Sequence, residues 1–241
     1  MTTIAANLQA VRRRIEQAAR AAGRAPSAIA LIAVSKTWPP EYIETAHACG
    51  QHAFGESYAQ EALAKIAQLS HLPLEWHFIG PIQSNKTRTL AEHFEWVHSV
   101  DRARIAQRLN DGRPGRLPRL NVCIEVNVSG EASKHGVPPG TEGDLARFIL
   151  SLPRLRLRGL MAVPEPTADV ALQRQRFGLL RQLRDDLNAA GFALDTLSMG
   201  MSDDLEAAIQ EGATMVRIGT AIFGRRPASP AQDAKAAGMS Q

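Results

Sequence analysis

Eight short apolar segments alternate with longer amphipathic segments along most of the chain. The apolar segments predict strands near residues 29–35, 52–55, 75–79, 95–99, 120–127, 155–163, 194–199 and 214–218. The amphipathic segments predict helices near residues 40–48, 57–69, 84–93, 101–110, 141–151, 168–190 and 203–211. This alternation is typical of a closed parallel barrel or a large doubly wound sheet. Eight strands within 241 residues favour an α/β fold of the (β/α)8 TIM barrel type.

Two further segments lie at the ends of this pattern. Residues 4–22 carry Leu8, Val11, Ile15 and Ala18 on one helical face, which predicts an additional N-terminal helix. No linker is long enough to separate two domains, so we expect a single barrel domain over residues 1–224. Residues 225–241 are rich in Ala, Ser, Pro and Gly without apolar periodicity, which predicts a flexible C-terminal tail.

Composition argues against several classes of protein. The net charge of +4 comes from scattered arginines, not from a basic block interleaved with aromatic residues, so we expect no nucleic-acid partner. The histidines lack metal-ligand spacing, and no apolar run approaches the roughly 18 residues of a membrane helix. Cys49 and Cys123 form no CxxC or Cys/His pattern and are expected to be reduced. We therefore expect a cytoplasmic protein with no metal and no membrane contact.

Lys36 follows the first predicted strand, directly before Thr37-Trp38-Pro39-Pro40. A lysine at the end of a buried strand places a primary amine where water is scarce. Scarce water lowers the pKa of the amine and makes it nucleophilic toward aldehydes and ketones. For an arbitrary lysine in such a place, a side chain that extends to solvent is the commoner arrangement. The residues that follow the other strands decide between these two interpretations.

Polar residues also follow the other predicted strands. The carboxyl ends of barrel strands share one rim, and functional groups collect at that rim. A purely structural scaffold would not need polar side chains concentrated there. The candidate rim residues are Glu56, Ser57, Tyr58, His77, Gln83, Ser84, Asn85, Lys86, His98, Asp101, Glu125, Asn127, Ser198, Ser202, Arg217 and Thr220.

Two clusters in this rim predict a phosphate site. Ser198-Met199-Gly200-Met201-Ser202 ends the seventh strand, and Arg217-Ile218-Gly219-Thr220 ends the eighth. Gly219 lets the backbone approach an anion closely, and barrels commonly bind phosphate with loops seven and eight. We expect Met199 and Met201 to pack around this loop. Either cluster alone is more often an ordinary turn, but the two together indicate a phosphate.

Lys36 and this phosphate site together fit pyridoxal 5′-phosphate (PLP), which is a phosphorylated aldehyde. Lys36 would form the Schiff base, while loops seven and eight would hold the phosphate. Arg217 then falls near the ring, and a guanidinium stays charged at any relevant pH. If Arg217 faces the pyridine nitrogen, that nitrogen remains unprotonated and the ring becomes a weaker electron sink. Such a site favours holding PLP over stabilising a substrate carbanion.

The chain resembles the YggS/PROSC family, the pyridoxal phosphate homeostasis proteins. Seven segments carry the resemblance in family order: AVSKT at 33–37, FGESY at 54–58, WHFIGPIQSNK at 76–86, HSVD at 98–101, GLM at 159–161, LSMGMS at 197–202 and VRIGTAIFG at 216–224. Together they cover nearly the whole chain. The resemblance implies a PLP barrel of fold type III, similar to the N-terminal domain of alanine racemase.

The resemblance also implies roles for single residues. Lys36 is implied as the Schiff-base lysine, Arg217 as the neighbour of the pyridine nitrogen, and Ser198, Gly219 and Thr220 as the residues around the phosphate. It implies a non-catalytic regulator of free PLP and of amino-acid balance. The family commonly has Asn at the position of Ser57, so a cofactor contact there must be made by a shorter side chain or through water.

Two enzymatic alternatives stay open at this point. An amino-acid racemase of the alanine racemase type needs a second acid/base, usually a tyrosine from an added domain, and only Tyr42 and Tyr58 are available. Tyr58 lies near the rim. A class I aldolase acting on a sugar phosphate would explain Lys36 and the phosphate site but not Arg217. The expected partners are PLP, amino acids and PLP-accepting apo-enzymes, and the missing dimerisation domain of racemases favours a monomer.

Four side chains allow both a functional and a structural interpretation. His77 is either a proton carrier or a hydrogen-bonded histidine of the barrel core. Asn85 and Lys86 either face a ligand or begin a solvated helix. Lys134, in the polar loop after strand five, is either an acceptor for a transferred aldehyde or an ordinary solvated lysine, and the latter is the expected state.

Overall fold

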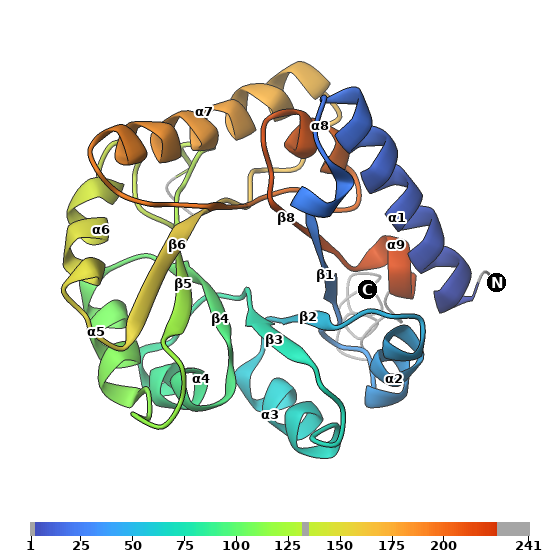
Figure 1. Ribbon diagram of the computed structural model, residues 1–241, viewed down its shortest axis with the longest axis horizontal. Coiled ribbons are helices and arrows are strands. Elements are labelled where there is room, and N and C mark those ends of the chain that lie inside the picture. The colour runs from blue at the N-terminus through green and yellow to red at the C-terminus, as the bar shows by residue number, and fades with distance from the viewer. Residues whose placement is uncertain (1–2, 132–134, 226–241) are drawn as a thin grey trace, which may run out of the picture.

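A computed structural model describes residues 3–131 and 135–225 of the chain. Eight parallel strands close into a barrel in sequence order, with β1 pairing both β2 and β8 (Figure 1). The strands are β1 Ala30–Val34, β2 Ala53–Glu56, β3 Glu75–Phe78, β4 Trp96–Val100, β5 Leu120–Glu125, β6 Leu155–Met161, β7 Thr196–Ser198 and β8 Met215–Ile218. The predicted (β/α)8 barrel is therefore confirmed.

Helices surround the barrel in the ribbon view (Figure 1). They are α1 Ile4–Ala21, α2 Pro40–Ala48, α3 Ala59–Gln68, α4 Thr87–His93, α5 Ala103–Gly112, α6 Glu142–Leu150, α7 Val170–Ala189, α8 Leu205–Gln210 and α9 Thr220–Phe223, with 3₁₀ turns at Pro26–Ala28 and Ser84–Lys86. Their starts follow local chemistry. Thr3 and Asp169 cap α1 and α7 through side-chain oxygens, and Pro40 occupies the first turn of α2.

The predicted elements differ from the observed ones mainly at their ends. β7 spans three residues where six were predicted, and β1 ends at Val34, so Lys36 lies two residues beyond the strand. The short helix α9 was not predicted, because its four residues are too few to show helical periodicity. Lys134 and residues 226–241 of the predicted tail lie outside the described residues.

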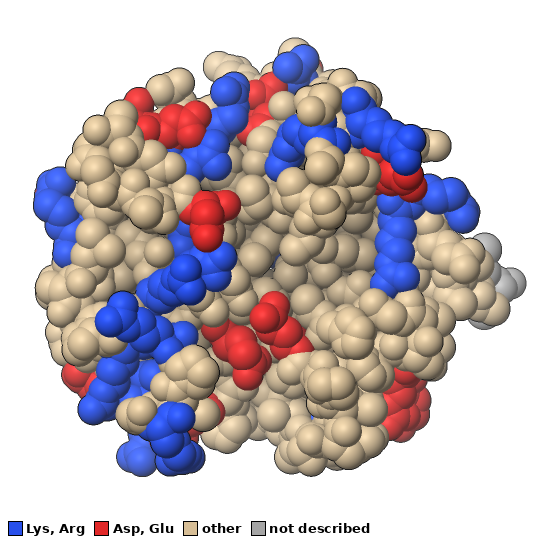
Figure 2. All heavy atoms as spheres, in the orientation of Figure 1, with Lys and Arg blue, Asp and Glu red and all other residues tan. Residues whose placement is uncertain are grey.

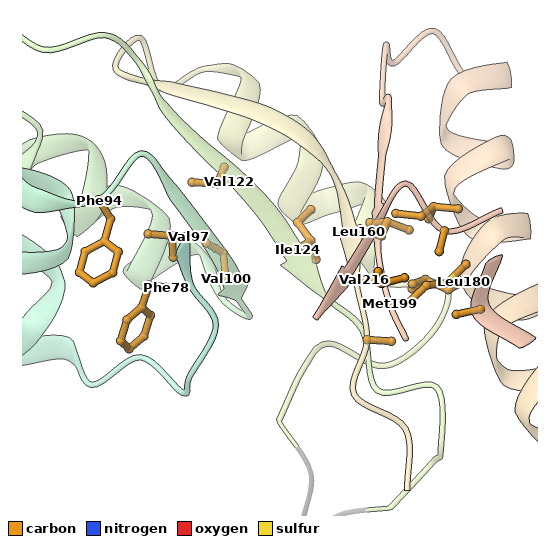
Figure 3. Packing of buried hydrophobic residues seen from close by; sticks show 14 of the residues in the cluster. Phe78, Phe94, Val97, Val100, Val122, Ile124, Leu160, Leu180, Met199 and Val216 are labelled. Carbon is orange, nitrogen blue, oxygen red and sulfur yellow. The ribbon is translucent and has the colours of Figure 1, made fainter. Parts of the chain in front are cut away.

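The main core lies between the sheet and the surrounding helices. Val97, Val122, Leu160 and Val216 project outward from four strands and are fully buried. Figure 3 shows Met199, Val216 and Leu180 packed together at one end of this layer and Phe78 with Phe94 at the other. Burial of each such side chain stabilises the fold by about 1.5–3 kcal/mol.

A second, smaller cluster fills the barrel interior. It consists of Trp96, Cys123 and Met161, with Met215 packed against it. Since side chains alternate between the two faces of a strand, residues two positions further along β4, β5 and β8 also point inward. Those residues are polar: His98, Glu125 and Arg217. Along β4, β5 and β8 the barrel interior is therefore apolar near the strand starts and polar toward the carboxyl ends.

The N-terminal helix α1 fixes the loops that follow β7 and β8. Arg14 forms an ion pair with Glu206 at 2.8 Å and donates to the Ser202 carbonyl at 3.0 Å. Asn7 donates to the Ile222 carbonyl at 2.9 Å. Figure 1 shows α1 running beside α8 and α9. The additional helix therefore braces the predicted phosphate loops.

The described residues contain neither a membrane-spanning helix nor a cluster of metal-binding side chains. No described helix is long and apolar enough to cross a membrane. No group of three or more His, Cys, Asp or Glu side chains in the described part is arranged to hold a metal ion. The face seen in Figure 2 is hollowed at its centre, and acidic side chains lie beside that hollow.

Candidate functional site

The backbone on both sides of Lys36 is held by side chains of α3. Lys65 Nζ donates to the Ser35 carbonyl at 2.8 Å, and the Thr37 N–H donates to Glu61 Oε1 at 2.5 Å. Thr37 has φ +69°, which is unusual for a residue other than glycine and marks a strained backbone. The Lys36 side chain itself is half-buried. These contacts fix the backbone from which the Lys36 side chain extends.

Lys65 is the centre of a buried charge cluster beneath this turn. Besides Ser35, its ammonium bonds Glu56 at 2.8 Å and Glu61 at 2.6 Å, so all three of its donors are used. The Ser35 hydroxyl also donates to Glu56 at 2.7 Å. Burial raises the pKa of Glu56, while the Lys65 charge acts in the opposite direction. Such a buried network holds one geometry, because loosening it would strand charges away from water.

Arg217 is a buried cation at the carboxyl end of β8. Its Nη1 donates to Ser198 Oγ at 2.7 Å and its Nη2 to the Ala162 carbonyl at 2.8 Å. Burial lowers the pKa of Arg217 to about 10, which leaves it charged at neutral pH. No carboxylate of the described chain lies within 4.0 Å of it. A guanidinium has five N–H donors, so donors remain for a further acceptor.

Two carboxyl groups interact with the charge of Arg217 from a greater distance. Asp204 and Glu125 both act on its charge without forming an ion pair. Burial and the nearby Asp101 raise the pKa of Glu125 to about 7, against a smaller opposite effect of Arg217. Glu125 therefore exchanges a proton near neutral pH at this rim. A perturbed carboxyl group of this kind is a common feature of functional sites.

The loops after β7 and β8 are tied to one another. The backbone N–H of Arg217 donates to the Gly200 carbonyl at 2.9 Å, and the backbone N–H of Ala221 donates to Ser202 Oγ at 3.3 Å. A Cβ on Gly219 would lie 3.2 Å from the Val34 carbonyl oxygen and 3.3 Å from Val34 Cβ. Loop eight therefore packs directly on the end of β1, next to the turn that carries Lys36.

The barrel, the lysine turn and the two tied loops match a described protein family. The family model "Alanine racemase, N-terminal domain" matches residues 6–227. A relative from Pseudomonas aeruginosa, named pyridoxal phosphate homeostasis protein, is 63% identical over 226 residues, which cover 94% of this chain and 97% of the relative. This chain belongs to the pyridoxal phosphate homeostasis protein family, within the alanine racemase N-terminal domain group.

Other relatives support the same assignment. The Escherichia coli K12 protein of the same name is 52% identical over 237 residues and covers 94% of this chain and 98% of its own length. The solved structure of PipY from Synechococcus elongatus PCC7942, with PLP bound, has a TM-score of 0.81 and 35% identity over 92% of this chain and all of that one. Alanine racemase from Clostridium difficile 630 shares the fold at 15% identity, with a TM-score of 0.66, and 57% of its chain is covered.

Within this family fold, the strongest predicted site residues lie on adjacent strands. Ile32 of β1 is in register with Arg217 of β8, and Lys36 follows four residues later. Ser57 follows β2, on the other side of β1, and is half-buried. Thr220 is exposed at the start of α9 and Gly219 precedes it. The barrel closure thus brings Lys36, Ser57, Arg217 and Gly219 to neighbouring positions at one rim.

Two predicted residues lie deeper than the sequence suggested. The Ser198 hydroxyl accepts from Arg217 and also bonds His98 Nδ1 at 2.8 Å, inside the barrel. The Met199 side chain is fully buried in the outer core, beneath the loop (Figure 3). Their predicted contacts with a cofactor stay predictions, and their observed contacts support Arg217 and the loop backbone.

Sequence reasoning missed Lys65 and Glu61. Their i,i+4 spacing in α3 was visible, but that spacing is also typical of exposed ion pairs on helices. The additional signal was Glu56, an acid at the end of an otherwise apolar strand, which needs a cation when buried. His77, in contrast, is a hydrogen-bonded core histidine, bonded to Glu75 and His98.

Proposed function

We propose that this protein binds PLP reversibly on Lys36 and acts in intracellular PLP homeostasis without a catalytic turnover of its own. The observation that carries the proposal is a lysine turn held by α3 at the end of β1, together with a buried guanidinium on the adjacent strand β8. The names of the relatives and the PLP-bound PipY structure support the same ligand.

The residues present fit the ligand at each of its polar ends. PLP supplies, when bound, an aldehyde that condenses reversibly with a primary amine, and we assign that amine to Lys36. The remaining N–H donors of Arg217 suit a neutral acceptor such as an unprotonated pyridine nitrogen. Gly219 and Gly200 let loops seven and eight pack closely, because a Cβ would lie 3.2 Å from the Val34 carbonyl oxygen at Gly219 and 2.6 Å from Ala208 Cβ at Gly200. We assign the phosphate to the backbone N–H groups of these two loops.

The other predicted residues take supporting places in this proposal. Ser198 orients Arg217 through its hydroxyl, and Met199 supports loop seven from the core. Thr220 contributes its hydroxyl at the phosphate end. Ser57 faces the ligand from the β2 side, with a water completing its reach. Residues 1–224 form one PLP-binding unit, because the closed barrel and the bracing helix α1 span nearly all of that range.

Holding PLP, and not transforming an amino acid, follows from the charge of Arg217. A guanidinium next to the pyridine nitrogen keeps the ring from becoming a strong electron sink, which weakens carbanion chemistry. Tyr58 is the observation that favours the racemase alternative, since it is 54% exposed at the rim and carries a phenolic hydroxyl. Under our proposal Tyr58 has no proton-transfer role.

The location and partners follow from the same picture. We place the protein in the cytoplasm, where Cys49 and Cys123, both free thiols, stay reduced. It acts as a monomer, exchanges PLP with apo-enzymes and meets amino acids at the open rim. Analytical ultracentrifugation tests the monomer, and transfer of PLP to an apo-enzyme of known activity tests the exchange.

An absorption titration tests the function as a whole. The purified protein mixed with PLP should develop a band that differs from that of free PLP and saturates at one equivalent. Incubation of that complex with L-alanine, followed by chiral analysis, should show no sustained formation of D-alanine. Absence of the band contradicts PLP binding, while continued racemisation supports the enzymatic alternative instead.

A further inference from the structure

A continuous chain of hydrogen bonds crosses the inside of the barrel from Arg217 to the opposite end. Ser198 Oγ links Arg217 to His98 Nδ1, with distances of 2.7 and 2.8 Å. His98 Nε2 lies 2.9 Å from His77 Nδ1, and His77 Nε2 lies 2.8 Å from Glu75 Oε1. Since β4 and β7 are not neighbours in the barrel, the bond between His98 and Ser198 spans its interior.

The two ends of this chain have different surroundings. Ser198, His98 and His77 are fully buried and Arg217 is 3% exposed. Glu75 is the first residue of β3, at the amino end of the barrel, and its side chain is 49% exposed. The chain therefore connects the site at the carboxyl rim with solvent at the far mouth.

The direction of every bond in the chain is determined by its ends. A guanidinium only donates, so Ser198 Oγ accepts from Arg217 and its own proton goes to His98 Nδ1. A neutral histidine has one donor and one acceptor, so His98 Nε2–H donates to His77 Nδ1 and His77 Nε2–H donates to Glu75. Burial lowers the pKa of both histidines, which keeps them neutral.

The charge of Glu75 agrees with this direction. The hydrogen bond from His77 lowers the pKa of Glu75, so the carboxyl group is an ionised acceptor at neutral pH. Arg158 adds a smaller favourable charge beside it. The opposite arrangement would need a protonated Glu75 and would give Ser198 Oγ two donors, with no partner in the described chain for its own proton.

We propose that Glu75, His77 and His98 are positioning residues for the ligand site, because they fix the Ser198 hydroxyl and, through it, the Arg217 guanidinium. A cation at one end and an anion at the other polarise every bond between them in the same sense, and polarised bonds in a buried chain strengthen one another. The orientation of Arg217 thus depends on a surface carboxylate at the other mouth of the barrel. The effect on a ligand rests on the proposed function, but the bond directions do not.

The first test measures the bond directions in the protein without added PLP. Nitrogen-15 NMR of the imidazole rings should show His77 and His98 as neutral Nε2–H tautomers at neutral pH. In Glu75→Ala, His77 loses its acceptor, so the Nε2–H form should no longer dominate. In Glu75→Gln, the amide oxygen still accepts, so the wild-type tautomers should be retained. A protonated ring or an Nδ1–H tautomer in the wild type overturns the proposal.

The second test measures the effect on the far site. Glu75→Ala should shift the absorption band of bound PLP and weaken PLP binding by about fivefold, near the lower limit for coupling between distant sites. Asp195→Ala is the matched control. Asp195 is a half-exposed carboxylate directly before β7, paired with Arg158 and outside the chain of bonds.

The two tests separate failure of this inference from failure of the proposed function. A wild-type protein that binds no PLP contradicts the proposed function, while the tautomers still decide the inference. The inference is overturned if the wild type binds PLP but Glu75→Ala and Asp195→Ala weaken that binding equally. A general loss of negative charge at the amino-terminal mouth of the barrel would then explain both effects. An effect of Glu75→Ala alone, partly rescued in Glu75→Gln, supports it.

Discussion

Lys65 of α3 donates a hydrogen bond to the carbonyl of Ser35 at 2.8 Å, directly before Lys36. The same ammonium is paired with Glu56 and Glu61, and Glu61 holds the next peptide N–H, that of Thr37. A buried ion cluster therefore determines the position of a turn that has a strained backbone. Burying these charges costs free energy. We attribute the presence of the cluster to the fixed geometry that it gives the lysine turn.

Replacement of Lys65 should distinguish its contribution to stability from its contribution to the geometry of the ligand site. Lys65→Met leaves the Glu56 carboxylate buried without its cation and should lower the free energy of unfolding by about 3–5 kcal/mol. The double variant Lys65→Met with Glu56→Gln removes both charges and should recover most of this loss in urea denaturation. PLP binding should stay weak in both variants, because the Ser35 carbonyl has lost its donor. Full recovery of binding in the double variant would contradict a positioning role for Lys65.

Glu125 should make stability depend on pH in the acidic to neutral range. Its folded pKa of about 7 exceeds its ordinary value of 4.5, so the folded state binds the proton more tightly than the unfolded state. The stabilisation is fully present below about 4.5 and is lost as the pH rises to about 7 and beyond. Its size is on the order of 3 kcal/mol for a group shifted this far.

Glu125→Gln tests this pH dependence directly. The variant cannot ionise, so its free energy of unfolding should change less between pH 4.5 and pH 7 than that of the wild type. Urea unfolding at several pH values, without PLP, provides the comparison. Identical pH profiles for the two proteins would show that Glu125 has an ordinary pKa in the folded state.

Two glycines with the same φ angle allow the cost of backbone strain to be measured separately from the cost of steric crowding. Gly200 in loop seven and Gly191 after α7 both have φ +95°, so alanine at either position costs roughly 1–2 kcal/mol in backbone strain. A Cβ at Gly191 meets nothing within 4 Å, whereas at Gly200 it lies 2.6 Å from Ala208 Cβ. Gly200→Ala should therefore cost about 1–3 kcal/mol more in thermal unfolding.

The same pair also tests the place of loop seven in the ligand site. Gly200→Ala should displace the Gly200 carbonyl, which accepts from the Arg217 N–H, and so weaken PLP binding. Gly191→Ala should leave PLP binding as in the wild type. Equal affinities of the two variants for PLP would show that the phosphate does not bind at loop seven.

The barrel could be predicted from the sequence because each strand is a short apolar run with its own turn signals. All eight strands were predicted at nearly their observed positions, and the placement of Lys36, Ser57, Arg217 and Gly219 at one rim follows from barrel closure alone. The predicted strand ends were less accurate. β7 comprises only Thr196–Ser198, because residues 194–195 and 199, which were also predicted as strand, lie in loops. Local patterns identify which residues lie at the rim.

Contacts across the barrel could not be predicted in this way. His98 and Ser198 are 100 residues apart, and their bond depends on the depth of each side chain inside a closed barrel. Lys65 had the spacing of an ordinary surface pair, and only the packing of α3 against β2 buries it. The sequence placed His98 and Arg217 only among the rim residues, whereas they belong, with His77, to a polar path inside the barrel.

In our proposal Lys36 holds PLP covalently and reversibly. Treatment of the PLP-loaded protein with borohydride should fix the bond, and peptide mass spectrometry should then find the added mass on Lys36. Lys36→Ala should lose both the absorption band and the adduct. An adduct located mainly on Lys65, Lys86, Lys134 or Lys235, or an unchanged band in Lys36→Ala, would contradict the account.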